Sequence, residues 1–449
     1  MAVVGGGMGG LMAALRLRQQ GVQVTLFEAS DQLGGMVRTV RRDGWEFETG
    51  ASTLTLTPAT REVLESSGPI DGMVRPAPGS QRRFLVHEGR LVPVPASPAE
   101  FLATPLLSLA GRMRFVKEPF VPRGALMPEE SMASFTRRRF GEEGAARIFD
   151  PLVSGTTGGD PEQLLARYTF PIEVEHERRS GSVLKGKLRA ARTARREGQA
   201  AVDTSPWSCA TGLSALPAHI AVALGSSCRT GVRVQKIGVA RTGRVSVVDD
   251  AGTAHEFDGA VVALPAPALG RVNIDAPGGE HMSRVASMPH ASLAVVCLGY
   301  RRADVSHPLD GHGLLAASSE RRRILGALFT SSQFPGRAPS GHVLLTVSIG
   351  GARQPAAVAL DDRALLEAAH DELRQLLGVS APPVASEIAR WPAALPLAVA
   401  GHAERLAVAA NVESSNPALA FTGTWRDGLL LRDVMQGGVA AADRLLQLA

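Results

Sequence analysis

The chain has 449 residues, of which 45% are hydrophobic and 48 are glycine, so it has room for two or three domains with a large core. Basic residues exceed acidic ones by five, a surplus too small to argue for nucleic-acid binding. These values exclude a disordered or fibrous chain and favour a globular enzyme with mixed helices and strands.

The first 28 residues predict a strand, a glycine turn, a helix and a second strand. The turn has the spacing Gly5-x-Gly7-x-x-Gly10, and the second strand, at 22–27, ends at Glu28. In this dinucleotide pattern Gly5 makes the bend, Gly7 admits a pyrophosphate to the backbone, and Gly10 lets helix and strand pack closely. The helix dipole favours the phosphates, and Glu28 can accept the ribose hydroxyls. A purely structural βαβ unit is the alternative, but all the parts occur here together.

A second glycine pair distinguishes between dinucleotides. Gly34 and Gly35 follow Glu28 by six residues, and glycine at that place lets a second loop close over the diphosphate. This extension is typical of FAD enzymes and not of ordinary NAD dehydrogenases. We therefore predict that the cofactor is FAD.

The next elements are a strand at 45–50, a helix at 59–67 and a hairpin at 81–94 that turns at Glu88-Gly89. From 97 to 198 the chain is expected to be helical and irregular, with an apolar stretch at 101–110 and a basic run from Arg178 to Arg196. A basic amphipathic helix of this kind fits an anionic membrane surface. A solvated helix face is the alternative, and the sequence leaves both open.

The second half of the chain alternates between two kinds of pattern. A helix at 213–223, a hairpin at 245–257 and a buried strand at 260–264 continue the dinucleotide-binding pattern. Strands at 292–299, 323–329 and 342–349, with a helix at 363–377 capped by Gly378, indicate a different, α+β domain.

The predicted fold class is therefore α/β and α+β, with a discontinuous Rossmann-like FAD-binding domain, a mixed-sheet substrate domain and a helical insertion. The FAD-binding domain is expected to comprise residues 1–55, 199–270 and 400–449. The substrate domain is expected to comprise 56–96 and 271–399, and the membrane-associating insertion 97–198.

The end of the chain is expected to close the cofactor site. A buried strand at 419–423 ends at Gly423, and a final helix from Val434 to 448 has Asp433 as its expected N-cap. In flavoproteins a late helix of this type points its N-terminus at the flavin pyrimidine, where negative charge grows on reduction. We therefore place Gly423, Asp433 and Val434 in the cofactor site.

Other kinds of catalytic machinery are not evident in the sequence. Cys209, Cys228 and Cys297 are widely spaced, so neither a disulfide framework nor a metal site is indicated, and a reducing cytoplasm is expected. No secretory signal is expected, and no apolar run approaches the roughly 18 residues of a spanning helix. The lack of an acid–base set suits a flavin oxidase, in which the cofactor does the chemistry and the protein orients it.

Several separated segments resemble the FAD-dependent protoporphyrinogen/coproporphyrinogen oxidases of haem synthesis, within the amine-oxidase-like superfamily. The likeness covers nearly the whole chain. Its motifs are the fingerprint through Gly35, Arg82-Arg83-Phe84-Leu85, Val94-Pro95-Ala96-Ser97-Pro98, Gly155-x-x-Gly158-Gly159-Asp160, Thr169-Phe170-Pro171, Gly350-Gly351-Ala352-Arg353, Arg390-Trp391-Pro392, Leu395-Pro396 and Gly401-His402.

The resemblance implies a role for particular residues. Arg83 would bind a substrate carboxylate, for which a bidentate guanidinium is suited, although an exposed cation on a hairpin is the alternative. Trp391 would lie beside the flavin, and Val234 near the adenine. The other substrate-facing positions would be Gly155 and Gly158, in a loop that lines the tetrapyrrole pocket, and Leu314, Leu328 and Ser348. The sequence departs from the family pattern at Gln32, Ala51, Ser348, Leu397, Ala398 and Gly428-Leu429-Leu430.

The activity implied is oxidation of a porphyrinogen, protoporphyrinogen IX or coproporphyrinogen III, by molecular oxygen with release of hydrogen peroxide. FAD would be bound without a covalent link, because no cysteine lies near the last strand and helix. The alternatives are an oxidase or desaturase of another apolar metabolite, and an inactive flavin-binding paralogue. The expected location is the cytoplasm, with attachment to the inner face of the cell membrane and a homodimer both left open.

Overall fold

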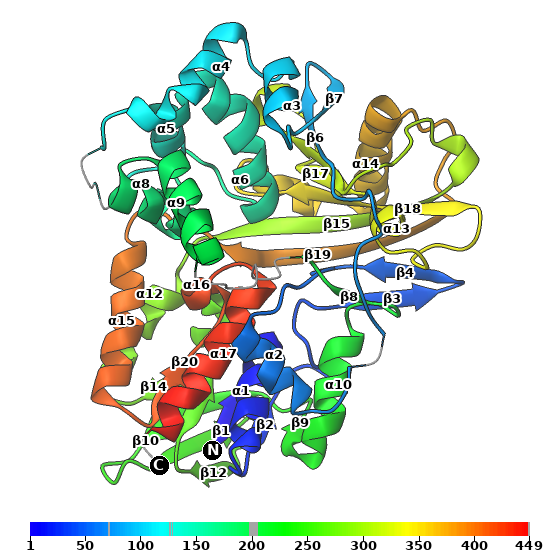
Figure 1. Ribbon diagram of the computed structural model, residues 1–449. Helices are drawn as coiled ribbons and strands as arrows, with labels where there is room; N and C mark the ends of the chain where they lie inside the picture. The colour runs from blue at the N-terminus through cyan, green and yellow to red at the C-terminus, as the bar shows by residue number, and fades with distance from the viewer. Residues whose placement is uncertain (71, 125–126, 128, 197–204, 448–449) are drawn as a thin grey trace.

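The computed structural model describes residues 1–70, 72–124, 127, 129–196 and 205–447. In Figure 1 the lower half holds both termini side by side, the long strands β15, β18 and β19 cross the middle, and the helices α3 to α9 lie above them on one side. The upper and lower parts are each built from segments far apart in the sequence.

A parallel sheet forms the centre of the lower half. Its strands follow the order β20-β13-β1-β2-β9, and every pairing is parallel. They are β1 (Ala2–Val4), β2 (Thr25–Phe27), β9 (Cys228–Arg229), β13 (Ala260–Val262) and β20 (Leu419–Phe421). Since β1, β13 and β20 are buried at every position, both faces of the sheet are covered. The strands expected at 22–27, 260–264 and 419–423 are confirmed, each somewhat shorter than expected.

Helices cover one face of this sheet, and a second sheet with further helices covers the other. The first set is α1 (Met8–Gln19), α2 (Pro58–Glu65), α10 (Ala215–Leu224) and α17 (Leu431–Leu446). The second set contains α11 (Ala266–Leu269), α12 (Ser283–Ala286), α15 (His402–Ser415) and the sheet β12-β11-β10-β14, whose strands are β10 (Val234–Val239), β11 (Val245–Asp249), β12 (Ala254–Phe257) and β14 (Asn273–Asp275).

The expected domain boundaries need two corrections. Residues 58–65 and 273–286 were expected in the substrate domain, but both pack on the lower half. Val63 and Leu64 of α2 complete the core beneath α1, and Ile274 and Val285 bury against the strands of the parallel sheet. The apolar side chains of these two segments pack in the cores of the lower half. Their packing partners there are distant in sequence, so the sequence did not indicate this placement.

A seven-stranded mixed sheet forms the middle of the molecule, in the order β19-β15-β18-β17-β16-β6-β7. Its strands are β6 (Arg83–His87), β7 (Arg90–Pro93), β15 (His290–Arg301), β16 (Gly313–Ala316), β17 (Gly326–Leu328), β18 (His342–Gly350) and β19 (Ala385–Pro396). The strands β16 and β19 and the helix α15 were not predicted. The hairpin of β6 and β7 does turn at Glu88 and Gly89, which both have positive φ.

One face of this sheet packs on α14 (Asp362–Leu377), which Asp361 and Gly378 cap. Because side chains alternate along a strand, the residues of this face can be assigned from the core they share. Phe84, Leu314, Ala327 and Val347 belong to the core beneath α14. Their neighbours along each strand therefore face the other way.

The helical layer comprises α3 (Pro98–Ala103), α4 (Leu109–Val116), α5 (Met132–Gly144), α6 (Asp150–Thr157), α7 (Ala166–Thr169), α8 (Pro171–Ser180) and α9 (Val183–Arg196). The basic run from Arg178 to Arg196, expected as one helix, is split between α8 and α9. Gly181 ends α8 in the left-handed conformation, with φ of 70°. The buried pair Arg139 and Glu118 then fixes the start of α9, because Glu118 also accepts the Val183 N–H at 2.9 Å.

Candidate cofactor and substrate site

The first glycine turn has the close contacts that its pattern predicts. Gly5, with φ of 106°, donates its N–H to the Phe27 carbonyl at 2.8 Å, which joins the ends of β1 and β2. A methyl group on Gly10 would lie 1.9 Å from the Gly5 carbonyl oxygen, so a side chain there would separate the turn from α1. A methyl group on Gly7 would meet nothing within 4 Å. The backbone at Gly7 is thus open to a ligand at the N-terminus of α1.

The second glycine pair lies against this turn. Gly34 donates its N–H to the Gly6 carbonyl at 2.8 Å, and a methyl group on Gly35 would lie 3.3 Å from the Gly7 Cα. Both residues of the pair have positive φ, of 106° and 61°. The second loop therefore lies against the first, and its closure over a bound diphosphate stays a prediction.

Glu28 connects the end of β2 to the turn. One carboxylate oxygen accepts the Gly6 N–H at 2.7 Å, and the other accepts the N–H and the hydroxyl of Ser30, both at 2.8 Å. The carboxylate is held at the edge of a cavity of about 270 Å³. Residues that line this cavity include Gly5, Gly7, Glu28, Gly35 and Val234, together with Arg233 and Arg271.

This cavity fits a dinucleotide. It brings the glycine turn, the Glu28 carboxylate and Val234 into one space, although Val234 lies more than 200 residues after the other two in the sequence. The two arginines at the cavity were not anticipated. Isolated arginines on a loop and after a short helix carry no signal in the sequence, so only the tertiary structure places them there.

The last strand and helix also reach the glycine turn. Val434 of α17 lies 3.2 Å, measured from Cγ1, from the place that a methyl group on Gly9 would occupy. Gly423 follows β20 and donates its N–H to Asp427 Oδ2 at 2.8 Å, while the Thr422 hydroxyl donates to the same oxygen at 2.6 Å. Burial raises the pKa of Asp427. Asp427 thus holds the end of β20 in shape, a role that the sequence did not indicate.

The expected N-cap of the final helix is wrong. The helix α17 starts at Leu431, its N-cap is Leu430, and Asp433 lies within the first turn. The Asp433 carboxylate pairs with Arg432 at 3.1 Å and caps no backbone N–H. The helix begins three residues earlier than expected, at Leu431, which packs against the core beneath α1. Asp433 still places a negative charge near the helix N-terminus.

Trp391 and Arg83 lie on the face of the seven-stranded sheet that is opposite to α14. Trp391 pairs with Leu293 across β19 and β15, and its indole N–H donates to the Thr49 carbonyl at 2.7 Å. Arg83 lies in line with Gly313, Leu328 and Thr346 across the ladder from β6 to β18. In the register, Leu328 and Ser348 belong to this same face.

The expectation that Leu314 lies on this face is wrong. Leu314 is packed beneath α14 with Phe84 and Ala327, on the far face of the sheet. Its neighbour Leu315 is the residue of β16 that faces the helical layer, where it packs against a separate core that includes Leu85 and Leu107. The strand β16 was not predicted, so the alternation of its side chains could not be assigned from the sequence.

The face that carries Arg83 is covered at two places. The hairpin of β3 (Thr39–Arg42) and β4 (Trp45–Glu48) buries one end through Trp45 and Phe47. The helical layer covers the other end through residues such as Leu107 and Ile148. Between them lie Leu293, Leu328 and Ser348, which are half-buried, with the exposed Arg83 at the edge. We call these four residues the strip.

The helix α6 borders the strip. Gly155 and Gly158 were expected in a loop, but Gly155 lies inside α6 and Gly158 caps it in the left-handed conformation. A methyl group on Gly155 would lie 2.5 Å from the Leu315 side chain, and one on Gly158 would lie 3.0 Å from Ala291 Cβ and 3.5 Å from Leu293. The two glycines therefore let α6 approach the sheet, which is a packing role and not one of an open loop.

Arg83 has no ion-pair or hydrogen-bond partner in the part of the chain that the structure describes, whereas the neighbouring Arg82 pairs with Asp310 at 3.2 Å. Burial and the Arg83 charge lower the pKa of His312 to about 4, so this histidine is neutral near pH 7. An exposed guanidinium beside an apolar strip suits a carboxylate of a mainly apolar ligand. No metal-binding cluster occurs among the described residues.

The chain is similar to a family of flavoproteins and to several porphyrinogen oxidases. A family model described as flavin containing amine oxidoreductase matches residues 8–446. The mitochondrial protoporphyrinogen oxidase of Nicotiana tabacum is 28% identical, over 99% of this chain and 94% of its own. The coproporphyrinogen III oxidase of Bacillus subtilis (strain 168) is 26% identical, over 100% and 98%. A crystal structure of a proposed protoporphyrinogen oxidase from Exiguobacterium sp. 255-15 has a TM-score of 0.81 at 23% identity, over 100% and 98%.

Proposed function

This chain belongs to the flavin-containing amine oxidoreductases and is an FAD-dependent oxidoreductase, and we propose that its substrate is a porphyrinogen. When bound, FAD supplies a hydride acceptor. Gly7, Glu28 and Val234, which line the cavity, would hold the adenosine and diphosphate part of FAD, and Trp391 would lie beside the flavin ring.

The observation that carries the proposal is the composition of the strip. Leu293 and Leu328 offer apolar contact to a large ring system, and Arg83 offers an unpaired cation to one of its carboxylates. A porphyrinogen has both features. The curated relatives, named as oxidases of protoporphyrinogen and of coproporphyrinogen III, support this class of substrate and leave the choice between the two open.

In the proposed reaction the strip orients the substrate so that a bridging methylene carbon faces the cofactor. A hydride leaves that carbon and a proton leaves the ring system, and together they reduce one molecule of oxygen to hydrogen peroxide. The chain need not supply a general acid or base at this carbon, because loss of the hydride and the proton together creates conjugation between the two rings that the carbon joins. Of the four residues of the strip, none is a carboxylate, a histidine or another acid–base side chain.

An anaerobic mixing experiment tests the proposal. The flavin absorbance of the purified enzyme should fall rapidly with coproporphyrinogen III or protoporphyrinogen IX, and admission of oxygen should restore it with formation of porphyrin and hydrogen peroxide. If bound flavin is reduced by neither compound, the proposal is wrong. The chain would then be an oxidase of another apolar compound or an inactive paralogue, and Ser348, where the family has a bulky apolar residue, would be the first position to examine.

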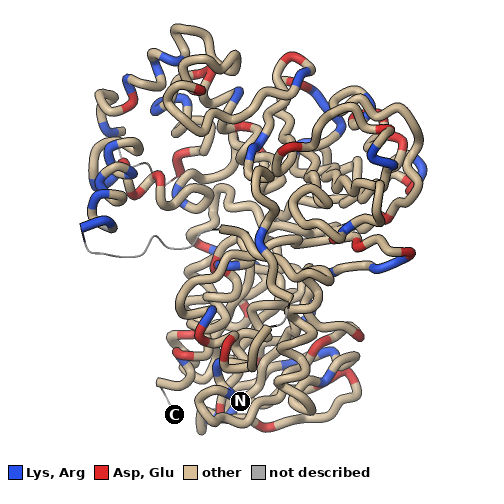
Figure 2. The backbone as a smooth tube through the Cα atoms, turned by 45° about the vertical axis from the view of Figure 1, so that its right-hand side comes forward, with Lys and Arg blue, Asp and Glu red and all other residues tan. Residues whose placement is uncertain are grey.

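We further propose that the enzyme is cytoplasmic and attaches to an anionic membrane surface through its helical layer. No helix in the described ranges is long and apolar enough to cross a membrane. Exposed apolar side chains lie within α4, at Leu109, Met113 and Val116, and another, Phe120, lies shortly after it. Basic residues follow one another along α9, just before the grey trace in Figure 2. The exposed apolar side chains and the basic helix support this part of the proposal, because such groups adsorb to anionic membrane surfaces.

A further inference from the structure

The segment from Gly350, the last residue of β18, to Arg353 holds both ends of α6. At the C-terminal end, Ala352 donates its N–H to the Gly158 carbonyl at 2.6 Å, and a methyl group on Gly351 would lie 2.7 Å from the same oxygen. At the N-terminal end, the Arg353 guanidinium lies 3.1 Å from Asp150 Oδ1. We call residues 350–353 the strap.

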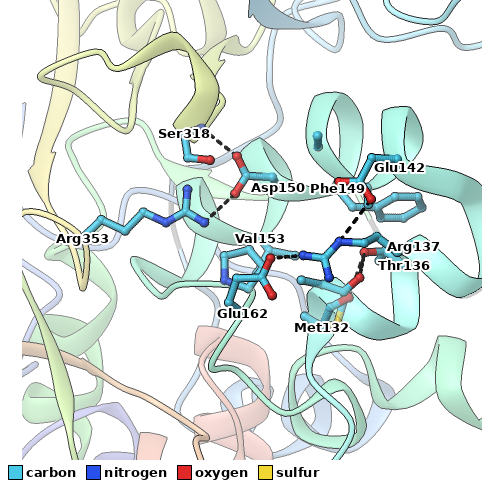
Figure 3. A pocket seen from close by; sticks show the side chains of 14 residues that line it. Met132, Thr136, Arg137, Glu142, Phe149, Asp150, Val153, Glu162, Ser318 and Arg353 are labelled. Carbon is cyan, nitrogen blue, oxygen red and sulfur yellow. Dashed lines mark hydrogen bonds and ion pairs between the residues drawn. The ribbon is translucent and has the colours of Figure 1, made fainter.

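The Asp150 carboxylate also connects α6 to a second strand. Its Oδ2 accepts the Ser318 N–H at 2.6 Å, and Ser318 follows β16. Figure 3 shows Asp150 between Ser318 and Arg353, with Arg353 approaching from a different element. Arg353 also pairs with Asp160 at 2.8 Å, beyond the C-terminal end of α6. The helix is thus tied to the ends of two strands of the seven-stranded sheet.

These ties affect the strip because β18 contains Ser348 of the strip and leads directly into the strap. Ser348, a residue of the strip, is three positions before Gly351, and Gly158 lies against Leu293, another residue of the strip. Leu315 fills the contact between Gly155 and the sheet. A shift of α6 would therefore change the space available above Leu293 and Ser348, without any change to the residues of the strip.

We propose that Arg353 is a positioning residue for the substrate. Together with Asp150, it fixes the distance between α6 and the strip. This inference rests on the proposed function of the strip. The side chains of Asp150 and Arg353 are 9% and 28% exposed, so the pair is sheltered from solvent on the Asp150 side. Loss of the arginine would leave the buried Asp150 with only Ser318 as a partner, and α6 would shift to bring its carboxylate to water.

A second cavity, lined by Asp150, Ser318 and Arg353 and also by Arg137, offers a matched control. Arg137 of α5 pairs with Glu162 and Glu142, and all three belong to the helical layer (Figure 3). Arg137 is therefore an arginine with two carboxylate partners in the same cavity, but it does not connect α6 to the sheet. Substitution of Arg137 removes the same charge without releasing the strap.

The test compares R353Q, R353K and R137Q as FAD-loaded enzymes. Hydrogen exchange followed by mass spectrometry should show faster exchange at residues 150–158 in R353Q than in R137Q, with unchanged flavin absorbance in both. For porphyrinogen oxidation, KM should rise about tenfold in R353Q, with kcat reduced less than threefold, and R353K should recover part of the loss because it keeps the charge beside Asp150.

Several outcomes would overturn the inference. Equal KM values in R353Q and R137Q, or equal exchange rates at residues 150–158, would show that Arg353 does not position α6. A uniform loss of kcat and FAD in R353Q, not recovered in R353K, would indicate a general folding role. If the wild-type enzyme oxidises no porphyrinogen, the proposed function fails, whereas the exchange data still decide whether Arg353 holds α6.

Discussion

Gly9 of α1 and Gly438 of α17 meet backbone to backbone: a methyl group on Gly438 would lie 2.0 Å from the Gly9 carbonyl oxygen. The first and last helices of the chain cross at this point, next to the glycine turn that lines the cofactor cavity. Gly438 could not be replaced without separating the helices, because the obstacle there is backbone and not a flexible side chain.

The first prediction is that Gly438→Ala lowers both stability and FAD retention. Overpacking of a tight contact typically costs about 1–3 kcal/mol, and the shift would also move Val434 away from Gly9. Thermal unfolding and the flavin content of purified protein would measure both effects. Gly238→Ala is a suitable control, since a methyl group there would meet only the Asp275 carbonyl oxygen at 4.0 Å.

The second prediction concerns Glu28. Glu28→Ala should weaken FAD binding about tenfold to a hundredfold, because hydrogen bonds to a charged group contribute about 1.5–3 kcal/mol. The variant also loses the acceptor for the Gly6 N–H, so the turn itself would relax. Titration of the apoprotein with FAD, followed by flavin fluorescence, would give the dissociation constants. Equal affinity in the variant would remove Glu28 from the cofactor site.

The third prediction separates two adjacent arginines. Arg83→Ala should raise KM for a porphyrinogen about tenfold to a hundredfold and leave FAD bound, because it removes the unpaired cation beside the strip. Arg82→Ala should have little effect, since Arg82 pairs with Asp310. Steady-state kinetics of both variants would decide the matter. Similar kinetics in Arg83→Ala and the wild type would make Arg83 an ordinary surface residue.

The fourth prediction concerns the membrane. The protein should co-sediment with vesicles that contain anionic lipid, with partial release by salt and fuller release by detergent, because each cation contributes on the order of 1 kcal/mol and the apolar contacts resist salt. Binding should be lost when the basic residues of α9 are changed together to Gln. These residues are Lys185, Lys187, Arg189, Arg192, Arg195 and Arg196.

A control for that experiment changes as many exposed arginines elsewhere on the molecule. They are Arg284, Arg301, Arg321, Arg323, Arg363 and Arg374. This variant should still bind anionic vesicles. If the wild-type protein remains in the supernatant at low salt, α9 is a solvated helix. Ion pairs that are already present would favour this second outcome. Arg178 and Arg179 pair with Glu175, and Lys187 pairs with Glu173.

The fifth prediction is that His402 contributes to a loss of folding stability as the pH is lowered. Burial, with a smaller contribution from Arg405, lowers the pKa of His402 from 6.5 to about 4. Between these values the unfolded chain binds the proton and the folded chain does not, so the free energy of unfolding falls as pH falls through this range. His402→Leu should flatten the fall of the melting temperature between about pH 6.5 and 4. His281→Leu, at an exposed histidine, should leave the wild-type slope.

The sequence by itself determined the cofactor half of this protein. The glycine motifs and Glu28 are local, because strand, turn and helix follow one another within 35 residues, and Gly5 and Gly10 answer backbone requirements that no other residue meets. Buried strands such as 260–264 were likewise evident, since a continuous apolar run can be buried without knowledge of its neighbours. The hairpin at Glu88-Gly89 also follows from turn chemistry alone.

Only the tertiary structure decided the substrate face. Whether Leu314 or Leu315 faces α6 depends on the register of β16 with β6 and β17, and a shift of one residue would exchange the two. The place of Asp427, and the ties from Arg353 to α6, depend on chain segments that meet only after folding. Such contacts carry no periodicity along the sequence, because their partners lie far apart in the chain and are brought together by the packing of the sheet and helices.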